Sequence, residues 1–118
     1  MALVVYHYPN CSTCKKALAW LRAHDIAFEP IDIVKQPPPA RVLERAARLG
    51  GVPARKMFNV SGEAYRAGKF KERLAGMTDA QAFAALAADG KLIKRPLALG
   101  DGVALVGFDE AAWRTALS

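Results

Sequence analysis

The strand–helix–strand pattern of residues 2–33 constrains the fold of this chain more than any other feature. Residues 2–8 are mostly β-branched, aromatic or aliphatic and end at Pro9-Asn10, which predicts a buried strand. The next segment, 12–24, places apolar side chains at helical spacing: Cys14, Ala17, Leu18 and Leu21. Residues 26–33 then resemble a second strand. Two strands joined through a helix run parallel, so the pattern predicts a βαβ unit and an α/β protein.

The middle of the chain is expected to be helical. Three prolines at 37–39 interrupt the pattern, and Pro39 suits the first turn of a helix that stops at Gly50-Gly51 and buries Val42, Leu43, Ala46 and Ala47. Shorter helical pieces are expected at 53–58 and 62–74. Thr78 and Gln81 have the spacing of a capping box, which predicts a helix ending near residue 89.

The C-terminal part returns to strands. Residues 97–106, with Gly100-Asp101-Gly102 between two apolar runs, predict a β-hairpin. Asp109 is expected to cap a last helix with one apolar face: Ala112, Trp113, Ala116 and Leu117. The element order is therefore β-α-β, a helical stretch, then β-β-α. This is the order of a thioredoxin-like fold with a helical insertion between its second and third strands.

The net charge of the 118-residue chain is +6, which permits an anionic partner. The basic residues are dispersed in short pairs rather than in one run, so we expect a solvated basic surface and no direct nucleic-acid contact. No apolar run reaches the ~18 residues that a membrane span requires. The N-terminus lacks the pattern of a signal peptide, and we expect a cytoplasmic protein without membrane contact.

The two cysteines of the chain form the motif Cys11-Ser12-Thr13-Cys14 at the predicted junction of the first strand and helix. The free N–H groups and the positive dipole end of a helix start stabilise a thiolate, and Lys15 and Lys16 add positive potential. Cys14 begins the apolar stripe and should be less exposed. We therefore predict that Cys11 attacks a substrate and that Cys14 resolves the resulting mixed disulfide.

Two other interpretations of the cysteines are open. A zinc site would need His7 and His24 as further ligands, and these four residues lack a usual zinc-ligand spacing, so no metal is expected. A pair of inert core thiols is the second alternative.

Arg95-Pro96 precedes the predicted hairpin. From its position alone this peptide bond is expected to be trans, because cis bonds are the minority before proline.

Four segments together resemble the arsenate reductase/Spx family of thioredoxin-fold proteins, in the branch that keeps both cysteines. They are Tyr8–Ala17 with Trp20-Leu21, Phe58–Gly62, Leu92–Leu97 and Val106–Phe108. The resemblance implies one domain over residues 1–118, with a four-stranded mixed sheet, a thioredoxin core at 1–33 and 95–118, and a helical lobe at 34–94. It also implies a cis bond before Pro96, which reverses the expectation from position, and it makes Cys11 catalytic and Arg95 an oxyanion-binding residue.

The resemblance leaves three functions open. The first is a thiol–disulfide oxidoreductase; the second is an arsenate reductase coupled to glutaredoxin; the third is an Spx-like redox-switched regulator that binds the RNA polymerase α subunit. Further arginines of the family's arsenate reductases fall near Asn59 and Gly107, which carry no cation, and this favours the first function. We expect Ser12, Thr13, Lys15, Arg95 and Pro96 to bind a small anionic or disulfide substrate.

The resemblance also bears on cofactors and assembly. No bound cofactor is expected, and glutathione, glutaredoxin or thioredoxin would act as electron donor. The family-based expectation for the assembly is a monomer.

Overall fold

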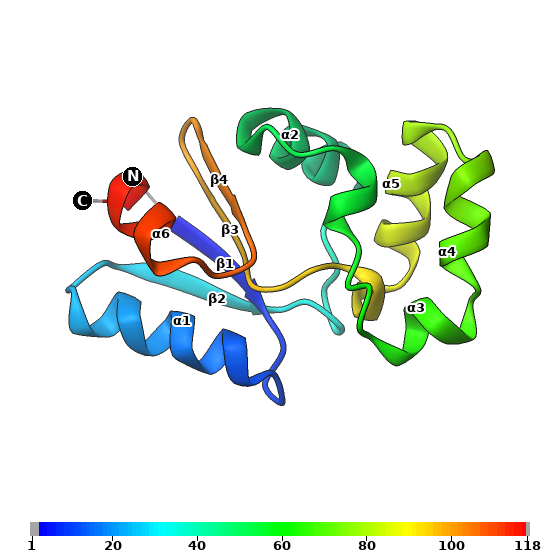
Figure 1. Ribbon diagram of the computed structural model, residues 1–118. Helices are drawn as coiled ribbons and strands as arrows, with labels where there is room; N and C mark the ends of the chain where they lie inside the picture. The colour runs from blue at the N-terminus through cyan, green and yellow to red at the C-terminus, as the bar shows by residue number, and fades with distance from the viewer. Residues whose placement is uncertain (1–2, 118) are drawn as a thin grey trace.

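A computed structural model describes residues 3–117 and contains a four-stranded sheet of order β2-β1-β3-β4 (Figure 1). The strands are β1 (Leu3–His7), β2 (Phe28–Asp32), β3 (Leu97–Gly100) and β4 (Val103–Val106). β1 pairs with β2 in parallel, and β3 is antiparallel to both β1 and β4. The predicted mixed sheet, its βαβ unit and its C-terminal hairpin are confirmed. Both predicted N-terminal strands are shorter than expected, and Ala2 lies outside the described residues.

Helices account for the rest of the fold. The helix of the βαβ unit is α1 (Ser12–Ala23), and the C-terminal helix is α6 (Glu110–Leu117). Between β2 and β3 the chain forms α2 (Ala40–Gly50), α3 (Glu63–Ala67), α4 (Phe70–Arg73) and α5 (Asp79–Ala88), with 3-10 turns at Ala54–Met57, Leu74–Gly76 and Gly90–Leu92. The expected helical insertion is therefore confirmed. No helix in residues 3–117 is long and apolar enough to cross a membrane.

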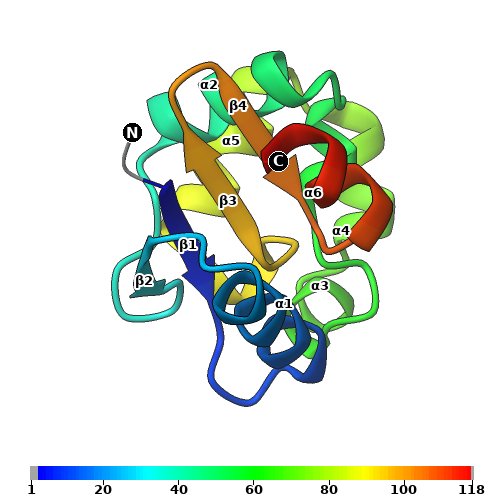
Figure 2. The same cartoon turned by 90° about the vertical axis from the view of Figure 1, so that its left-hand side faces the viewer.

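The two faces of the sheet pack against different sets of helices (Figures 1 and 2). On one face, Leu3 and Val5 of β1 and Ala98 of β3 pack with α1 and with Trp113 of α6. On the other face, Leu97 of β3 joins a larger apolar cluster that includes α2 and α5. Neighbouring strand residues thus point to opposite layers, as the pleat requires. Leu43, Ala46 and Ala47 of α2 are buried as predicted, whereas Val42 is only half-buried.

The helix ends follow the predicted signals with two corrections. Thr78 and Gln81 form the full capping box of α5, and Gly51 ends α2 in the left-handed conformation, with φ of 66°. Pro39, however, precedes α2 as its N-cap and does not lie in its first turn. On α6, Ala112 and Ala116 are exposed and only Trp113 is fully buried, because the short helix contacts the core along a narrow line.

Gly90 provides a sharp test of how tightly the insertion is joined to the sheet. A Cβ atom at this position would lie 1.9 Å from the carbonyl oxygen of Ile33, a backbone atom that cannot rotate away. We expect Gly90→Ala to lower the free energy of unfolding by about 2–3 kcal/mol, the usual range for overpacking. Urea denaturation measures this. Gly76→Ala is the control, because a Cβ there meets nothing within 4 Å, and equal stability of the two variants would contradict the prediction.

Candidate active site

Cys11 lies at the turn from β1 into α1, where it is the N-cap residue of the helix. Its Sγ accepts a hydrogen bond from the backbone N–H of Cys14 at 3.4 Å, and its own N–H donates to the carbonyl of Tyr8. The side chain is half-buried. The first turn of α1 contains no acidic residue, so no carboxylate there opposes a negative charge on the sulfur.

Cys14 lies one turn further along α1 and faces the core. Only 1% of the residue is exposed, and its Sγ accepts a hydrogen bond from the N–H of Tyr8 at 3.5 Å. Both cysteines are free thiols. The predicted difference in exposure between the two sulfurs is confirmed, and the solvent-facing one is Cys11.

The two thiols differ in acidity because their surroundings differ. Burial raises the pKa of Cys11, but the side-chain and backbone hydrogen bonds from Cys14, together with the charge and a hydrogen bond of Arg95, outweigh it and leave the pKa lowered. Burial and the neighbouring Cys11 raise the pKa of Cys14 to about 12, against the hydrogen bond from Tyr8. The thiolate therefore forms more readily at Cys11 than at Cys14.

Arg95 precedes β3 and is held in place from two sides. Its Nη1 donates to the carbonyl of Lys91 at 3.2 Å, and its guanidinium carbon lies 4.8 Å from the ring centre of Tyr8. Its buried Nε has no hydrogen-bond partner within the described residues. An arginine fixed in this way presents unused N–H donors, and a guanidinium suits the bidentate binding of a carboxylate or oxyanion.

A cavity of about 340 Å³ adjoins these residues. Thr13 contributes from α1, Lys94 and Arg95 from the segment before β3, and Asn59 and Gly107 from two loops. The peptide bond between Arg95 and Pro96 is cis, as the resemblance implied and contrary to the expectation from position alone. Pro96 itself is fully buried, and its carbonyl accepts a hydrogen bond from the N–H of Gly107 at 2.8 Å.

Of the predicted site residues, only Thr13 and Arg95 line this cavity. Neither cysteine lines it, nor does Pro96, and Ser12 and Lys15 are exposed in the first turn of α1 away from it. The lining also includes one carboxylate, that of Asp109. The charge that acts on the Cys11 thiol comes from Arg95 rather than from Lys15. No group of three His, Cys, Asp or Glu side chains within residues 3–117 is arranged to hold a metal ion, so His7 and His24 do not complete a ligand set with the cysteines.

Lys94 is the site residue that sequence reasoning missed. A Cβ built on Gly107 would lie 3.0 Å from the Cε of Lys94, so the lysine side chain occupies the space that a larger residue at 107 would fill. Gly107 itself carries no cation, but the side chain of Lys94 brings a positive charge to the same place from the segment before β3. The dipeptide Lys94-Arg95 was the only signal in the sequence.

The fold and the paired cysteines at the start of α1 define a thioredoxin-fold protein with a CxxC pair. The chain belongs to the ArsC family, whose model matches residues 6–116. A crystal structure of an ArsC family related protein from Bacteroides fragilis has a TM-score of 0.94 and 38% identity, covering 98% of this chain and 97% of that one. The structure of a possible arsenate reductase from Streptococcus mutans UA159 has a TM-score of 0.89 and 37% identity, covering 98% of each chain.

Two curated relatives place the chain within the family more closely. It is 41% identical over 110 residues to the uncharacterised protein YusI of Bacillus subtilis, which covers 93% of each chain. It is 23% identical to the global transcriptional regulator Spx of Lactiplantibacillus plantarum, over 92% of this chain and 80% of that one. The resemblance to arsenate reductase and Spx proteins that the sequence indicated is confirmed.

Proposed function

We propose that this ArsC family protein is a thiol–disulfide oxidoreductase in which Cys11 is the nucleophile and Cys14 the resolving thiol. The observation that carries the proposal is the pair of opposite pKa shifts on two cysteines one helical turn apart. A nucleophilic cysteine must be an accessible thiolate, whereas a resolving cysteine must stay protonated until the mixed disulfide has formed. Cys11 and Cys14 differ in this sense in both exposure and acidity.

In the first step, the Cys11 thiolate attacks one sulfur of a substrate disulfide. The substrate S–S bond breaks, a Cys11–substrate disulfide forms, and the other half of the substrate leaves as a thiolate. The N–H of Cys14 and the guanidinium of Arg95 stabilise the attacking sulfur. Arg95 and Lys94 also favour an anionic substrate, since both line the adjoining cavity.

In the second step, Cys14 attacks the Sγ of Cys11 and releases the second half of the substrate as a thiol. The cysteine pair is now a disulfide, and the substrate has gained both electrons. The negative charge of Cys11 contributes to the raised pKa of Cys14, and this contribution ends when Cys11 becomes part of a mixed disulfide. Formation of the first intermediate therefore makes the second thiol easier to ionise.

A dithiol protein such as glutaredoxin or thioredoxin, or two molecules of glutathione, would return the pair to its reduced form. The donor attacks the Cys11–Cys14 disulfide and is itself oxidised to a disulfide, so the electrons balance over one cycle. Thiol donors are also the expected electron source for the rest of the family's reductive chemistry. Cys11, as the more exposed sulfur, is the atom that a donor can reach.

Arsenate reduction is the second candidate function, and Lys94 is the observation that favours it. Lys94 and Arg95 place two cations on one small cavity beside the N-terminal turn of α1. The relative from Streptococcus mutans is described as a possible arsenate reductase. In this reaction the Cys11 thiolate would bond to arsenic with loss of water. A second thiol, from Cys14 or glutathione, would then attack the Cys11 sulfur, so that the S–As bond breaks, arsenite leaves and a disulfide forms.

The acidity of Cys11 tests the proposal directly. We expect its alkylation by iodoacetamide, followed by mass spectrometry across a pH series, to show a midpoint below that of an ordinary thiol near pH ~8.5. Arg95→Ala should move this midpoint upward, because the neighbouring positive charge that stabilises the thiolate is removed. Arg41→Ala, which removes an exposed cation on α2, is the control and should leave it unchanged. An ordinary midpoint in the wild type would contradict the proposal.

A further inference from the structure

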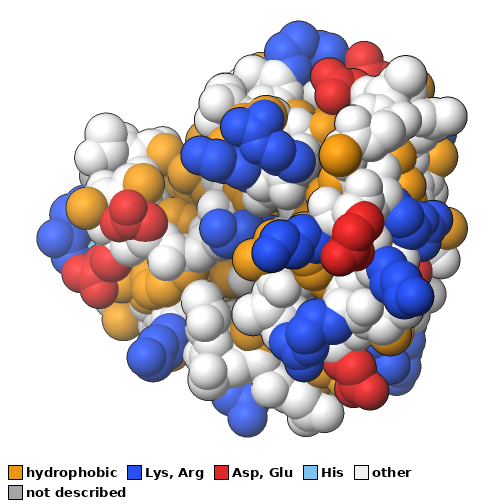
Figure 3. Space-filling view, turned by 45° about the vertical axis from the view of Figure 1, so that its right-hand side comes forward, with side chains coloured by type: hydrophobic (Ala, Val, Ile, Leu, Met, Phe, Trp, Pro, Cys, Tyr) orange, Lys and Arg blue, Asp and Glu red, His pale blue; other side chains and the backbone are white. Residues whose placement is uncertain are grey.

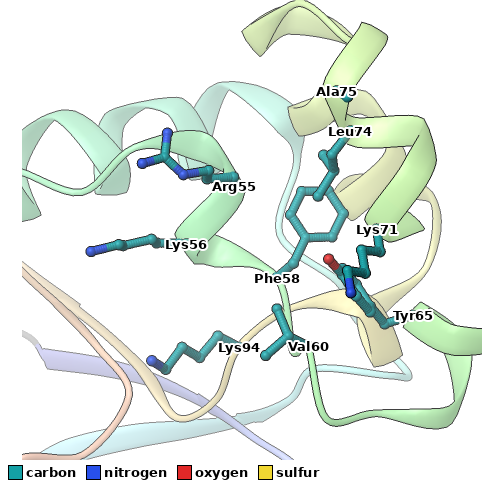
Figure 4. Close-up of a pocket in the computed structure, with 9 residues that line it drawn as sticks. All are labelled: Arg55, Lys56, Phe58, Val60, Tyr65, Lys71, Leu74, Ala75 and Lys94. Carbon is teal, nitrogen blue, oxygen red and sulfur yellow. The ribbon is translucent and has the colours of Figure 1, made fainter. Parts of the chain in front are cut away.

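A second cavity, of about 650 Å³, is lined by residues of the helical insertion (Figure 4). Apolar side chains form its floor: Phe58, Val60, Tyr65 and Leu74. Four cations surround that floor: Arg55, Lys56, Lys71 and Lys94. Figure 4 shows Phe58 and Val60 between Lys56 and Lys94 on one side and Lys71 and Tyr65 on the other. The proposed reaction uses none of these residues except Lys94.

This cavity is the middle part of a longer groove. It shares Lys94 with the cavity that Thr13 and Arg95 line, so the two cavities adjoin at this lysine. At its other end it shares Val60, Tyr65 and Lys71 with a third hollow of about 270 Å³ that reaches Arg66 and Lys69. An extended ligand fits such a series of linked hollows better than a compact one does.

The charge of the groove is strongly one-sided. Its middle part has no acidic lining residue, and the only acidic residues of the two end hollows are Asp109 and Glu72. Within the described chain, none of Arg55, Lys56, Lys71 and Lys94 forms an ion pair with a carboxylate. Figure 3 shows Lys and Arg side chains gathered on the corresponding side of the molecule, with apolar surface exposed between them. These cations are free to bind an acidic ligand.

The floor of the groove indicates what kind of acidic ligand it suits. Val60 is 60% exposed, against 39% for Leu49, the other exposed large apolar side chain in residues 3–117. Phe58 is 2% exposed, and the half-buried Tyr65 is the one aromatic residue of the cavity lining that is partly open to a ligand. Nucleic-acid strands bind through several bases stacked on successive aromatic side chains, and this lining does not offer such a series. An apolar side chain flanked by carboxylates matches this surface better than a sugar-phosphate backbone does.

We propose that this groove binds an extended, acidic segment of the protein whose disulfide reacts with Cys11, with an apolar side chain of that segment against Val60. The inference rests on the proposed function and adds to it the class of substrate, a protein rather than a small disulfide. Lys94 lines both this cavity and the one that Arg95 lines, and Arg95 acts on the Cys11 thiol, so a segment bound in the groove extends toward the reacting sulfur. The cationic rim steers the encounter, and the apolar floor holds the docked segment.

The test measures binding separately from chemistry. The probe is the fluorescein-labelled, cysteine-free peptide Asp-Phe-Glu-Asp-Leu-Glu, titrated with the full chain and followed by fluorescence anisotropy. We expect Lys56→Glu/Lys71→Glu to raise the Kd about tenfold, because each reversal replaces an attraction by a repulsion. The matched control is Lys35→Glu/Arg41→Glu, which makes the same change of charge at exposed residues outside the groove and should bind like the wild type. Val60→Ser should also weaken binding.

Each outcome either supports or overturns the docking proposal. Equal binding of a neutral peptide, Asn-Phe-Gln-Asn-Leu-Gln, would overturn it, and so would equal loss in the two double variants. Tighter binding of single-stranded oligothymidylate that is lost in Lys56→Glu/Lys71→Glu would overturn it in favour of a nucleic-acid surface. Cys11→Ser should bind the probe normally. If it does so while the wild-type thiol fails to react with disulfides, docking stands and the proposed redox function fails.

Discussion

Replacing Cys11 by Ser is expected to reduce the rate of disulfide reduction about a thousandfold or more. A serine hydroxyl does not ionise at neutral pH, and the N–H of Cys14 and the charge of Arg95 cannot compensate for the loss of a sulfur nucleophile. The measurement is the consumption of NADPH above the rate without this protein, with a protein disulfide that the thioredoxin donor system alone reduces slowly. Substantial activity of the Cys11→Ser variant would mean that this sulfur is not the nucleophile.

Cys14→Ser is the matched variant, and it is expected to fail at a different step. Because Cys11 keeps its position at the start of α1, the variant should still attack the substrate and then stop at the mixed disulfide, which intact-protein mass spectrometry detects as one bound substrate half. Turnover of dithiol substrates at the wild-type rate would contradict the resolving role of Cys14.

Arsenate used as the oxidant in the NADPH assay separates the two candidate functions, since only an arsenate reductase consumes NADPH with it.

The sheet and its strand order could be predicted because the local sequence patterns of the strands, helix and turn agree with the way these elements pair in the fold. The apolar run at 2–8, the helical stripe beginning at Cys14 and the turn at Gly100-Asp101-Gly102 each indicate a single structure, and a helical connection forces β1 and β2 to be parallel. The short helices α3 and α4 were predicted only as helical pieces. Their division depends on Lys69, which adopts a left-handed conformation that no residue pattern signals for a lysine.

The candidate site was predictable where it depends on neighbours in the sequence, and less so where it depends on neighbours in space. The capping position of Cys11 and the burial of Cys14 follow from their spacing at the start of a helix. The contribution of Lys94 does not, because it arises from the approach of its side chain to Gly107, which is distant along the chain. Lys15 illustrates the opposite case, since it is close in sequence to Cys11 but exposed away from the cavity.

The second large effect is expected from Trp113→Ala on stability. Trp113 is 1% exposed and is the only buried residue of α6. Its ring contacts those of Phe108 and Trp20 edge to face, at centroid distances of 5.0 Å and 6.3 Å. Truncation of a buried tryptophan removes these contacts and leaves a large cavity, so the free energy of unfolding should fall by about 3–5 kcal/mol in urea denaturation. Much of the stability of a small domain, typically about 5–15 kcal/mol, would then be lost.

Trp113→Phe separates the packing of the ring from its hydrogen bond. The indole Nε1 donates to the carbonyl of Gly107 at 3.0 Å, and Gly107 lines the cavity beside Arg95. Phenylalanine keeps most of the apolar contact and loses only this bond, so we expect a smaller loss of about 1–2 kcal/mol. If both variants were equally stable, the ring would not be what holds α6 on the sheet. A lower affinity for anions in Trp113→Phe, at nearly normal stability, would indicate that the core also positions the loop that borders the thiol site.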